Sequence, residues 1–356
     1  MRIAVAVSGG TDSLAALILL KRQGYDVLAL HGRFLPHGGD GPGPSDELQR
    51  ILDGLGVRLV ALDLRDAFRR AVIEPFVEAY RAGLTPNPCA ACNRAVKFGT
   101  LLDKAMDMGC TSLATGHYAR LEGAAANPVL RRGADPAKDQ SYFLSLVPLE
   151  RLARAAMPLG GRTKDEARAL LNELGVTPPL PAESQEICFV PRDDYCAFLE
   201  ALPGAPLPGP GPILLVDRAT GEEIEVGRHQ GLWRHTQGQR RGLGVAWAEP
   251  LYVLDKDCDR NALIVGTAPQ AMAGGCRARR VNVLVPPERW PGTILAQTRY
   301  RQQARPVEAR LESSDEDDSL TIIFNEPRGL PAPGQVVALY APDGTVLAGG
   351  VIAEVL

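Results

Sequence analysis

The sequence lacks a long apolar segment. No run of about 18 consecutive apolar residues occurs, and the N-terminus leads directly into a strand-like stretch, so we expect no membrane span and no signal peptide and predict a cytoplasmic protein. An excess of positive charge is also missing, and the net charge of −3 argues against a uniformly basic nucleic-acid binder. The seven cysteines are an odd number at irregular spacing, which favours metal or redox chemistry over a disulfide scaffold.

What is present is the composition of an ordinary globular protein, with 45% hydrophobic and 23% charged residues. A chain of 356 residues is long for one domain, so we expect two or three. The 37 glycines and 29 prolines indicate many turns.

The first two hundred residues have the pattern of an α/β domain. Arg2–Val7 predicts a strand that enters a tight turn, and Ser13–Gln23 predicts a helix that is apolar almost all round. Further strands are expected over 26–30, 57–62 and 112–115, with helical stretches over 45–55 and 98–108. Strands that alternate with helices at this spacing are typical of right-handed βαβ units and a parallel sheet.

The pattern changes after Leu202–Pro212, a stretch too rich in proline and glycine for a helix or strand, which we interpret as a linker. Short strands separated by turns are expected beyond it, over 213–216, 251–254, 262–265, 320–324 and 336–340. We therefore predict an α/β domain over residues 1–202, a small β-rich central domain over 203–268 and a C-terminal β-barrel over 269–356.

The turn after the first strand has the composition of a phosphate-binding loop. Two glycines in Ser8–Ser13 (SGGTDS) allow the backbone to approach an anion, and the following helix offers free N–H groups and the positive end of its dipole. The hydroxyl groups of Ser8, Thr11 and Ser13 can add donors. SGGxDS resembles the pyrophosphate loop of ATP pyrophosphatases, and that resemblance implies that Asp12 holds Mg²⁺ on the phosphates of ATP.

A second dense motif contains two cysteines. In Thr85–Asn93 (TPNPCAACN) the prolines predict a loop that carries Cys89 and Cys92 into a helix beginning near Asn93. A cysteine near a helix N-terminus has a stabilised thiolate, so we expect a nucleophile here. Cys188 lies about a hundred residues further on. Taken alone, the C-x-x-C pair fits a zinc knuckle, a redox dithiol, an iron–sulfur site or a catalytic pair.

Several longer motifs extend the resemblance over the whole chain. The chain resembles the tRNA-specific 2-thiouridylases in the segments TPNPxxxCNxxxKF (85–98), ATGHYAR (114–120), KDQSYFL (138–144), ESQEICF (183–189), GRHQGLWRHTQGQRRGLG (227–244), YVLDKD (252–257) and TRYRQ (298–302). The resemblance implies an ATP-pyrophosphatase domain of the adenine nucleotide α-hydrolase-like fold, a small central domain and a C-terminal β-barrel, which together grip the anticodon arm of tRNA. It implies 2-thiolation of the wobble uridine with ATP and Mg²⁺. The sulfur would come from a persulfide or sulfide donor protein.

The resemblance also implies roles for individual residues. Cys92 corresponds to the nucleophile and Cys188 to the cysteine that carries the persulfide. The positions that correspond to ATP contacts are Ala6, Val7, Ser8, Gly9, Gly10, Thr11, Asp12, Ser13, Gly32 and Gly116. The positions that correspond to contacts with tRNA or its target base are Asn87, Pro88, Cys89, His117, Lys138, Asp139, Gln140, Arg299, Tyr300 and Gln335.

The chain departs from the family at position 89, where many members carry an aspartate credited with acid/base work. Three thiols, from Cys89, Cys92 and Cys188, could hold a 4Fe–4S cluster with one iron open to sulfur. The alternative is a persulfide on Cys188 that Cys92 resolves by forming a disulfide, with Cys89 as a bystander. The acidic insert common after the second strand is reduced here to the Gly/Pro-rich stretch 36–44. The other cysteines, at 110, 196, 258 and 276, are expected to be small buried apolar residues.

Two other functions compete with thiolation. An ATP pyrophosphatase that uses ammonia or an amine as its nucleophile would leave Cys92 and Cys188 without a role. A non-catalytic RNA-binding module with structural zinc would leave the SGGTDS loop without a role. Residues 269–310 carry eight arginines against two glutamates, a basic strip that could follow a phosphate backbone or be a solvated face.

Overall fold

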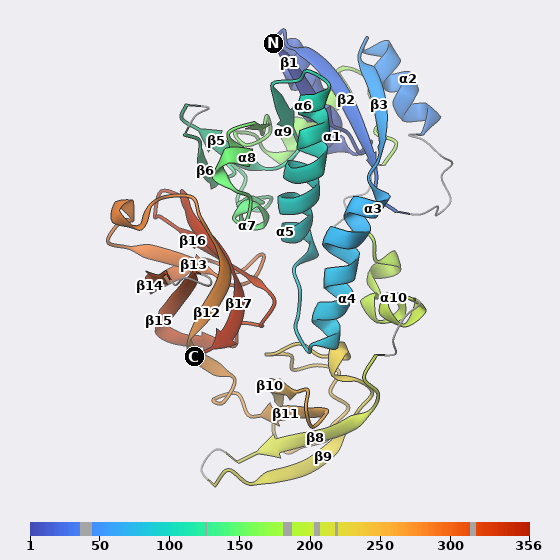
Figure 1. Cartoon of the computed structure of the whole chain (residues 1–356). Helices are drawn as coiled ribbons and strands as arrows, with labels where there is room; N and C mark the ends of the chain where they lie inside the picture. The colour runs from blue at the N-terminus through green and yellow to red at the C-terminus, as the bar shows by residue number, and fades with distance from the viewer. Residues whose placement is uncertain (36–44, 125–126, 181–186, 203–206, 218–219, 314–317) are drawn as a thin grey trace.

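The computed structural model describes residues 1–35, 45–124, 127–180, 187–202, 207–217, 220–313 and 318–356. An α/β domain forms the upper part of the molecule in Figure 1, the red and orange barrel lies beside its lower half, and the yellow central sheet lies below both. The Gly/Pro-rich stretch 36–44 and most of the ESQEICF motif lie outside the described residues. Among the residues described, no helix combines the length and the apolar character needed to span a membrane.

The α/β domain is built on a five-stranded parallel sheet in the order β3-β2-β1-β4-β7. Its strands are β1 (Arg2–Ala6), β2 (Asp26–Arg33), β3 (Arg58–Asp63), β4 (Ser112–Ala114) and β7 (Ala155–Ala156). Apolar side chains pack against the sheet in two clusters, one that contains α1 and one that contains Cys92, and a further cluster joins this domain to the barrel. Parallel strands joined by helices need both faces covered, which explains why the α1 sequence is apolar almost all round.

Helices cover this sheet and extend below it. They are α1 (Thr11–Arg22), α2 (Asp46–Gly54), α3 (Arg65–Phe68), the π-helical η1 (Arg69–Ile73), α4 (Glu74–Arg81), α5 (Pro88–Cys92), the π-helical η2 (Asn93–Leu101), α6 (Leu102–Asp107), α7 (Ser141–Leu144), α8 (Leu149–Leu152), α9 (Lys164–Glu173), the 3₁₀ turn η3 (Pro191–Asp193) and α10 (Tyr195–Ala201). A two-stranded hairpin, β5 (Ala119–Glu122) with β6 (Val129–Arg132), lies against the barrel end of the domain.

The central domain is a four-stranded sheet in the order β10-β11-β8-β9. Its strands are β8 (Gly211–Val216), β9 (Glu223–His229), β10 (Tyr252–Asp257) and β11 (Ala262–Gly266), and the short 3₁₀ turn η4 (Leu232–Arg234) follows β9. The pairing of β8 with β11 is parallel and the other two pairings are antiparallel. A small apolar core that includes Ile213, Leu232 and Val253 lies on one face.

The C-terminal domain is a closed antiparallel barrel in the order β12-β15-β14-β13-β16-β17, in which β17 pairs back onto β12. Its strands are β12 (Met272–Val283), β13 (Ile294–Gln297), β14 (Arg305–Glu312), β15 (Ser319–Gly329), β16 (Val336–Tyr340) and β17 (Val346–Val355), with the 3₁₀ turn η5 (Pro287–Arg289) after β12. Closure leaves no free sheet edge, and the interior is filled by small and branched side chains such as Cys276, Ile322 and Val337.

The fold class expected from sequence is confirmed, including the parallel sheet and the barrel. Each expected strand is present, several of them longer than expected, such as β15, which runs from Ser319 to Gly329. One local prediction is wrong: the helix expected to begin near Asn93 begins at Pro88. Proline fits the first helical position because it has no N–H to leave unbonded, and Asn87 caps the turn by accepting from the Ala90 N–H at 3.1 Å.

Candidate nucleotide and cysteine site

The SGGTDS loop joins the carboxyl end of β1 to the N-terminus of α1. Gly9 has a φ of +91°, a conformation that disfavours other residues. The Ser13 hydroxyl donates to the Gly10 carbonyl at 2.9 Å and accepts from the Ser8 N–H at 3.3 Å, so these residues shape the loop from inside. No side chain in the described part of the chain caps the N-terminus of α1. Its first N–H groups and helix dipole therefore suit an anion such as a phosphate.

Asp12 lies at the centre of a half-buried polar group beside this loop. Its Oδ1 accepts from Lys164 Nζ at 2.7 Å and from the Tyr118 hydroxyl at 2.8 Å. Lys164 is 5% exposed and begins α9, where Thr163 and Glu166 form a capping box. Sequence reasoning missed Lys164, and the only signal was the Thr-Lys-Asp-Glu start of a helix. A carboxylate beside a phosphate loop also fits Mg²⁺, which takes one or two carboxylates together with phosphate oxygens.

Gly116 brings the segment after β4 against the same loop. A Cβ atom at Gly116 would lie 2.7 Å from the Asp12 carbonyl carbon, closer than real Cβ atoms approach backbone. Gly32 lies near the end of β2, where a Cβ would meet the Phe34 ring at 2.8 Å. Of these two predicted ATP positions, the structure places Gly116 in contact with the loop and Gly32 on a strand paired with β3.

The cysteine helix α5 leads directly into the π-helical segment η2. Cys92, at the end of α5, is buried with 8% exposure in the apolar cluster below the sheet, whereas Cys188 is exposed. Burial raises the pKa of the Cys92 thiol to about 11, and it also raises the pKa of the Cys89 and Cys188 thiols. The expected stabilised thiolate is therefore wrong for this conformation: Cys92 lies inside a helix and away from water, where the neutral thiol is favoured.

Lys97 is a second residue that sequence reasoning missed. Its charge lowers the pKa of all three thiols, opposing the effect of burial, and it also lowers the pKa of the buried His117, which burial holds well below its ordinary value. An α-helix would turn a residue five positions after Cys92 about 140° away. In a π-helix, hydrogen bonds close from i to i+5, so Lys97 returns to the face of Cys92.

The three thiols are electrostatic neighbours but not a preformed metal site. Within the described ranges, no group of three or more His, Cys, Asp or Glu side chains is arranged to hold a metal ion. All seven cysteines are free thiols in this structure. The residues as placed do not fit a 4Fe–4S cluster, and that cluster remains a prediction from sequence. Of the remaining cysteines, Cys110 and Cys276 are buried as expected, but Cys196 is half-buried and Cys258 is exposed, contrary to expectation.

The barrel fixes the segment that precedes the cysteine helix. Gln335 donates through Nε2 to the carbonyls of Thr85 and Pro86 at 3.2 and 3.1 Å, and it accepts from Asn87 Nδ2 at 3.4 Å. Gly334, with a φ of +92°, touches the Thr85 backbone, where a Cβ would lie 2.9 Å from the carbonyl oxygen. In this structure Gln335 therefore positions the segment 85–87 rather than facing outward.

The other predicted tRNA positions fall into two groups. Asp139 is buried and its carboxylate accepts from Arg132 Nη1 at 2.8 Å, from two backbone N–H groups and from the Ser141 hydroxyl. Gln140 accepts from the Tyr118 N–H at 3.1 Å, and His117 pairs with the Thr115 hydroxyl at 2.7 Å. Lys138 is half-buried and Arg299 is exposed. Asp139, Gln140 and His117 thus support the fold around the loop, whereas Arg299 offers a cationic group to solvent.

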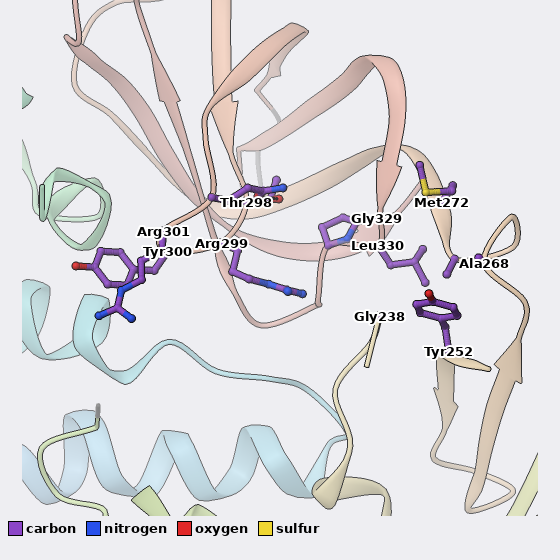
Figure 2. Close-up of a pocket in the computed structure, with 13 residues that line it drawn as sticks. Gly238, Tyr252, Ala268, Met272, Thr298, Arg299, Tyr300, Arg301, Gly329 and Leu330 are labelled. Carbon is purple, nitrogen blue, oxygen red and sulfur yellow. Dashed lines mark hydrogen bonds between the residues drawn. The ribbon is translucent and has the colours of Figure 1, made fainter. Parts of the chain in front are cut away.

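Arg299 and Tyr300 lie on a tight turn between β13 and β14, and the turn borders a pocket of about 420 Å³. Figure 2 shows the Arg299 side chain extending toward Gly238 and Leu330, while Tyr300 and Arg301 point to the other side of the turn. Tyr300 packs against Phe143 with ring centroids 4.3 Å apart. The predicted tRNA residues therefore lie where the barrel, the central sheet and the α/β domain approach one another.

Comparison with protein families matches all three parts of the chain. Residues 1–192 match a family described as the tRNA methyl transferase HUP domain, residues 207–267 match the tRNA methyl transferase PRC-barrel domain, and residues 273–352 match the aminomethyltransferase beta-barrel domain. Among solved structures, the U34-tRNA thiolase NcsA from Methanococcus maripaludis, solved with its 4Fe–4S cluster, is 16% identical with a TM-score of 0.33 over 52% of this chain and 60% of that one. A likeness of that extent carries no argument about the site.

Relatives of known description are similar over their whole length. The chain is 52% identical to the tRNA-specific 2-thiouridylase MnmA of Oleidesulfovibrio alaskensis, over 100% of both chains. It is 52% identical to that of Nitratidesulfovibrio vulgaris strain Miyazaki F and 45% identical to that of Lawsonia intracellularis, over 99% of each chain. With its nucleotide loop, its cysteine helix and its three-part architecture, the chain belongs to the tRNA-specific 2-thiouridylase MnmA family.

Proposed function

We propose that this protein catalyses the ATP-dependent 2-thiolation of the wobble uridine of tRNA. The observation that carries the proposal is that one chain of this family combines an anion-binding loop, Ser8–Ser13, with a buried cysteine, Cys92, that interacts electrostatically with the exposed Cys188. The loop suits the binding of ATP, and the cysteines suit the transfer of sulfur. An amine-using pyrophosphatase would need only the loop.

The nucleotide half of the reaction activates a poor leaving group. Uridine O2 attacks the α-phosphorus of ATP, the bond to pyrophosphate breaks, and the ring then carries AMP at C2. The loop amides and the N-terminus of α1 would hold the departing pyrophosphate. Asp12 would hold Mg²⁺, which neutralises charge on the phosphates when bound. Lys164, paired with Asp12, fixes that carboxylate in place.

The sulfur half of the reaction uses both cysteines. A donor protein leaves a persulfide on Cys188, whose exposure allows that transfer. The terminal sulfur attacks C2 and AMP leaves, so the sulfur bridges Cys188 and the base. The Cys92 thiolate then attacks Cys188 Sγ, which breaks the S–S bond, releases 2-thiouridine and leaves a Cys92–Cys188 disulfide. The sulfane sulfur gains two electrons, the two cysteines lose them, and an external thiol restores both.

Lys97 supplies a positive charge near the sulfur anions that form in these steps. It is half-buried on η2, and the described part of the chain places no carboxylate within ion-pair distance of it. Its charge acts on Cys92 and Cys188 alike. We assign Lys97 the role of stabilising the developing sulfur anions. This role matters more in a chain where Cys89 replaces an aspartate, because a thiol cannot serve as a carboxylate base.

For the RNA, we propose that the anticodon arm lies across the face where the three domains meet. Arg299, Tyr300 and Lys138 contact it directly. Asn87, Pro88 and Cys89 face the target base, while Asp139, Gln140, His117 and Gln335 position the segments that carry those contacts.

The function is tested by thiolation of unmodified tRNA in the presence of Mg·ATP and a persulfide donor, read as slower migration on mercury-containing gels. Cys92→Ser and Cys188→Ser should each abolish the shift, while Cys258→Ser, which changes an exposed cysteine on the turn after β10, should retain it. Full activity of Cys92→Ser would refute the nucleophile assignment. Iron and sulfide analysis after anaerobic purification tests the cluster. If the parent holds stoichiometric iron, and Cys89→Asp loses both the iron and the activity, the cluster mechanism would replace the persulfide route.

A further inference from the structure

The pocket beside Arg299 is bordered by two domains and has two chemically different ends. Tyr252 of β10 and Leu330 with Met272 of the barrel form an apolar end, on the right in Figure 2. The guanidinium of Arg299 extends along the other end, and no carboxylate of the described residues lies within ion-pair distance of it. An aromatic ring with apolar neighbours beside an unpaired guanidinium suits a base together with its phosphate.

Two hydrogen bonds hold the turn that carries Arg299. One runs from the Gln302 N–H to the Arg299 carbonyl at 3.1 Å, and in the other the buried Thr298 donates through its hydroxyl to Gln302 Oε1 at 2.9 Å. Arg301 has a φ of +64°, a conformation that is uncommon outside glycine. A turn held in this way keeps Arg299 and Tyr300 on opposite sides, as Figure 2 shows.

The far side of the turn leads to the cysteine site. Tyr300 packs on Phe143, and the Phe143 carbonyl accepts from Asn93 Nδ2 at 3.1 Å. Asn93 is the residue after Cys92. One four-residue turn therefore separates the neighbourhood of the cysteine from the pocket.

We infer that the pocket receives the nucleotide next to the target uridine in the RNA chain, with its base against Tyr252 and its phosphate on Arg299, so that the turn divides two neighbouring nucleotides. This inference rests on the proposed function and adds a second base-binding site to it. Single-stranded RNA is bound by splaying bases apart and stacking them on aromatic rings. The pocket volume is within the range of about 300–1,000 Å³ for ligand sites.

The test measures binding, without ATP or a sulfur donor, of anticodon stem-loop RNAs that lack one base. Tyr252→Ala should weaken binding of the intact stem-loop by about 5- to 150-fold, the range for losing one base–aromatic stack. Tyr252→Phe keeps the ring and should restore affinity. Tyr25→Ala, a partly exposed tyrosine of the α/β domain, is the matched control and should bind as the parent does.

Removing the base just 5′ or just 3′ of the target uridine identifies the occupant. With the correct abasic RNA, the parent and Tyr252→Ala should bind equally weakly, because the stack is already absent. The inference is overturned if Tyr252→Ala binds intact RNA like the parent, or if its loss is the same with every abasic RNA. It is also overturned if a free nucleoside monophosphate, and not RNA, shows the dependence on Tyr252. A stem-loop that shows the expected pattern but is never thiolated would refute the proposed function and leave the pocket assignment intact.

Discussion

The buried position of Cys92 predicts how slowly its thiol reacts with an alkylating agent. Burial raises the pKa of this thiol to about 11 from the ordinary 9.0. That difference corresponds to about 2.7 kcal/mol in favour of the neutral thiol. At about pH 8 an exposed cysteine is roughly one-tenth thiolate, whereas Cys92 is roughly one-thousandth. Because only the thiolate is alkylated, Cys92 of the free enzyme should react about 100-fold more slowly than an exposed thiol.

The assay is iodoacetamide labelling at a series of pH values, with the modified peptides quantified by mass spectrometry. The rate at Cys92 should rise about tenfold per pH unit from about pH 7 to about pH 10 without reaching a plateau. Circular dichroism at each pH confirms that the protein stays folded. A plateau below about pH 9 would mean that Cys92 is already a thiolate at neutral pH, and the reasoning from burial would be refuted.

The same assay isolates the effect of Lys97. Lys97→Met removes the charge that opposes burial, so the Cys92 and Cys188 rates should both fall at every pH below their pKa values. Lys97→Arg keeps the charge and should preserve them. Lys104→Met is the matched control, because this exposed lysine on α6 pairs with Asp107 instead. Equal rates in the parent and in Lys97→Met would remove Lys97 from the proposed mechanism.

Three further predictions concern ATP and tRNA. Asp12→Asn should stop pyrophosphate release while leaving tRNA affinity nearly unchanged, because the charge that holds Mg²⁺ is lost; weak tRNA binding with continued ATP turnover would contradict this role. Gly116→Ala should abolish ATP binding, measured by calorimetry, since its Cβ would lie 2.7 Å from the Asp12 backbone, and retained affinity would mean that the loop adapts. Arg299→Gln should reduce the slope of log Kd against log salt by about one, as expected for one phosphate contact, and an unchanged slope would assign Arg299 to packing.

Local sequence determined the elements and the chemistry that a short segment can specify. Alternating strands and helices predicted the parallel sheet, because each βαβ unit is specified by its own periodicity. The SGGTDS motif predicted the loop for a similar reason: Gly9 and the hydroxyls of Ser8 and Ser13 act within six consecutive residues. The closed barrel followed from its short strands and from the family resemblance.

Only the tertiary structure decided which residues meet. Lys164 reaches Asp12 across 152 positions, and Gln335 reaches Thr85 across 250, distances over which no periodic pattern carries information. The state of Cys92 was also decided there: the sequence suggested a thiolate at a helix N-terminus, but the fold buries Cys92 in the apolar cluster, and that burial outweighs the opposing charge of Lys97. Lys97 depends on a π-helical turn that brings position i+5 back to the same face, and a local irregularity of that kind is set by packing rather than by residue type.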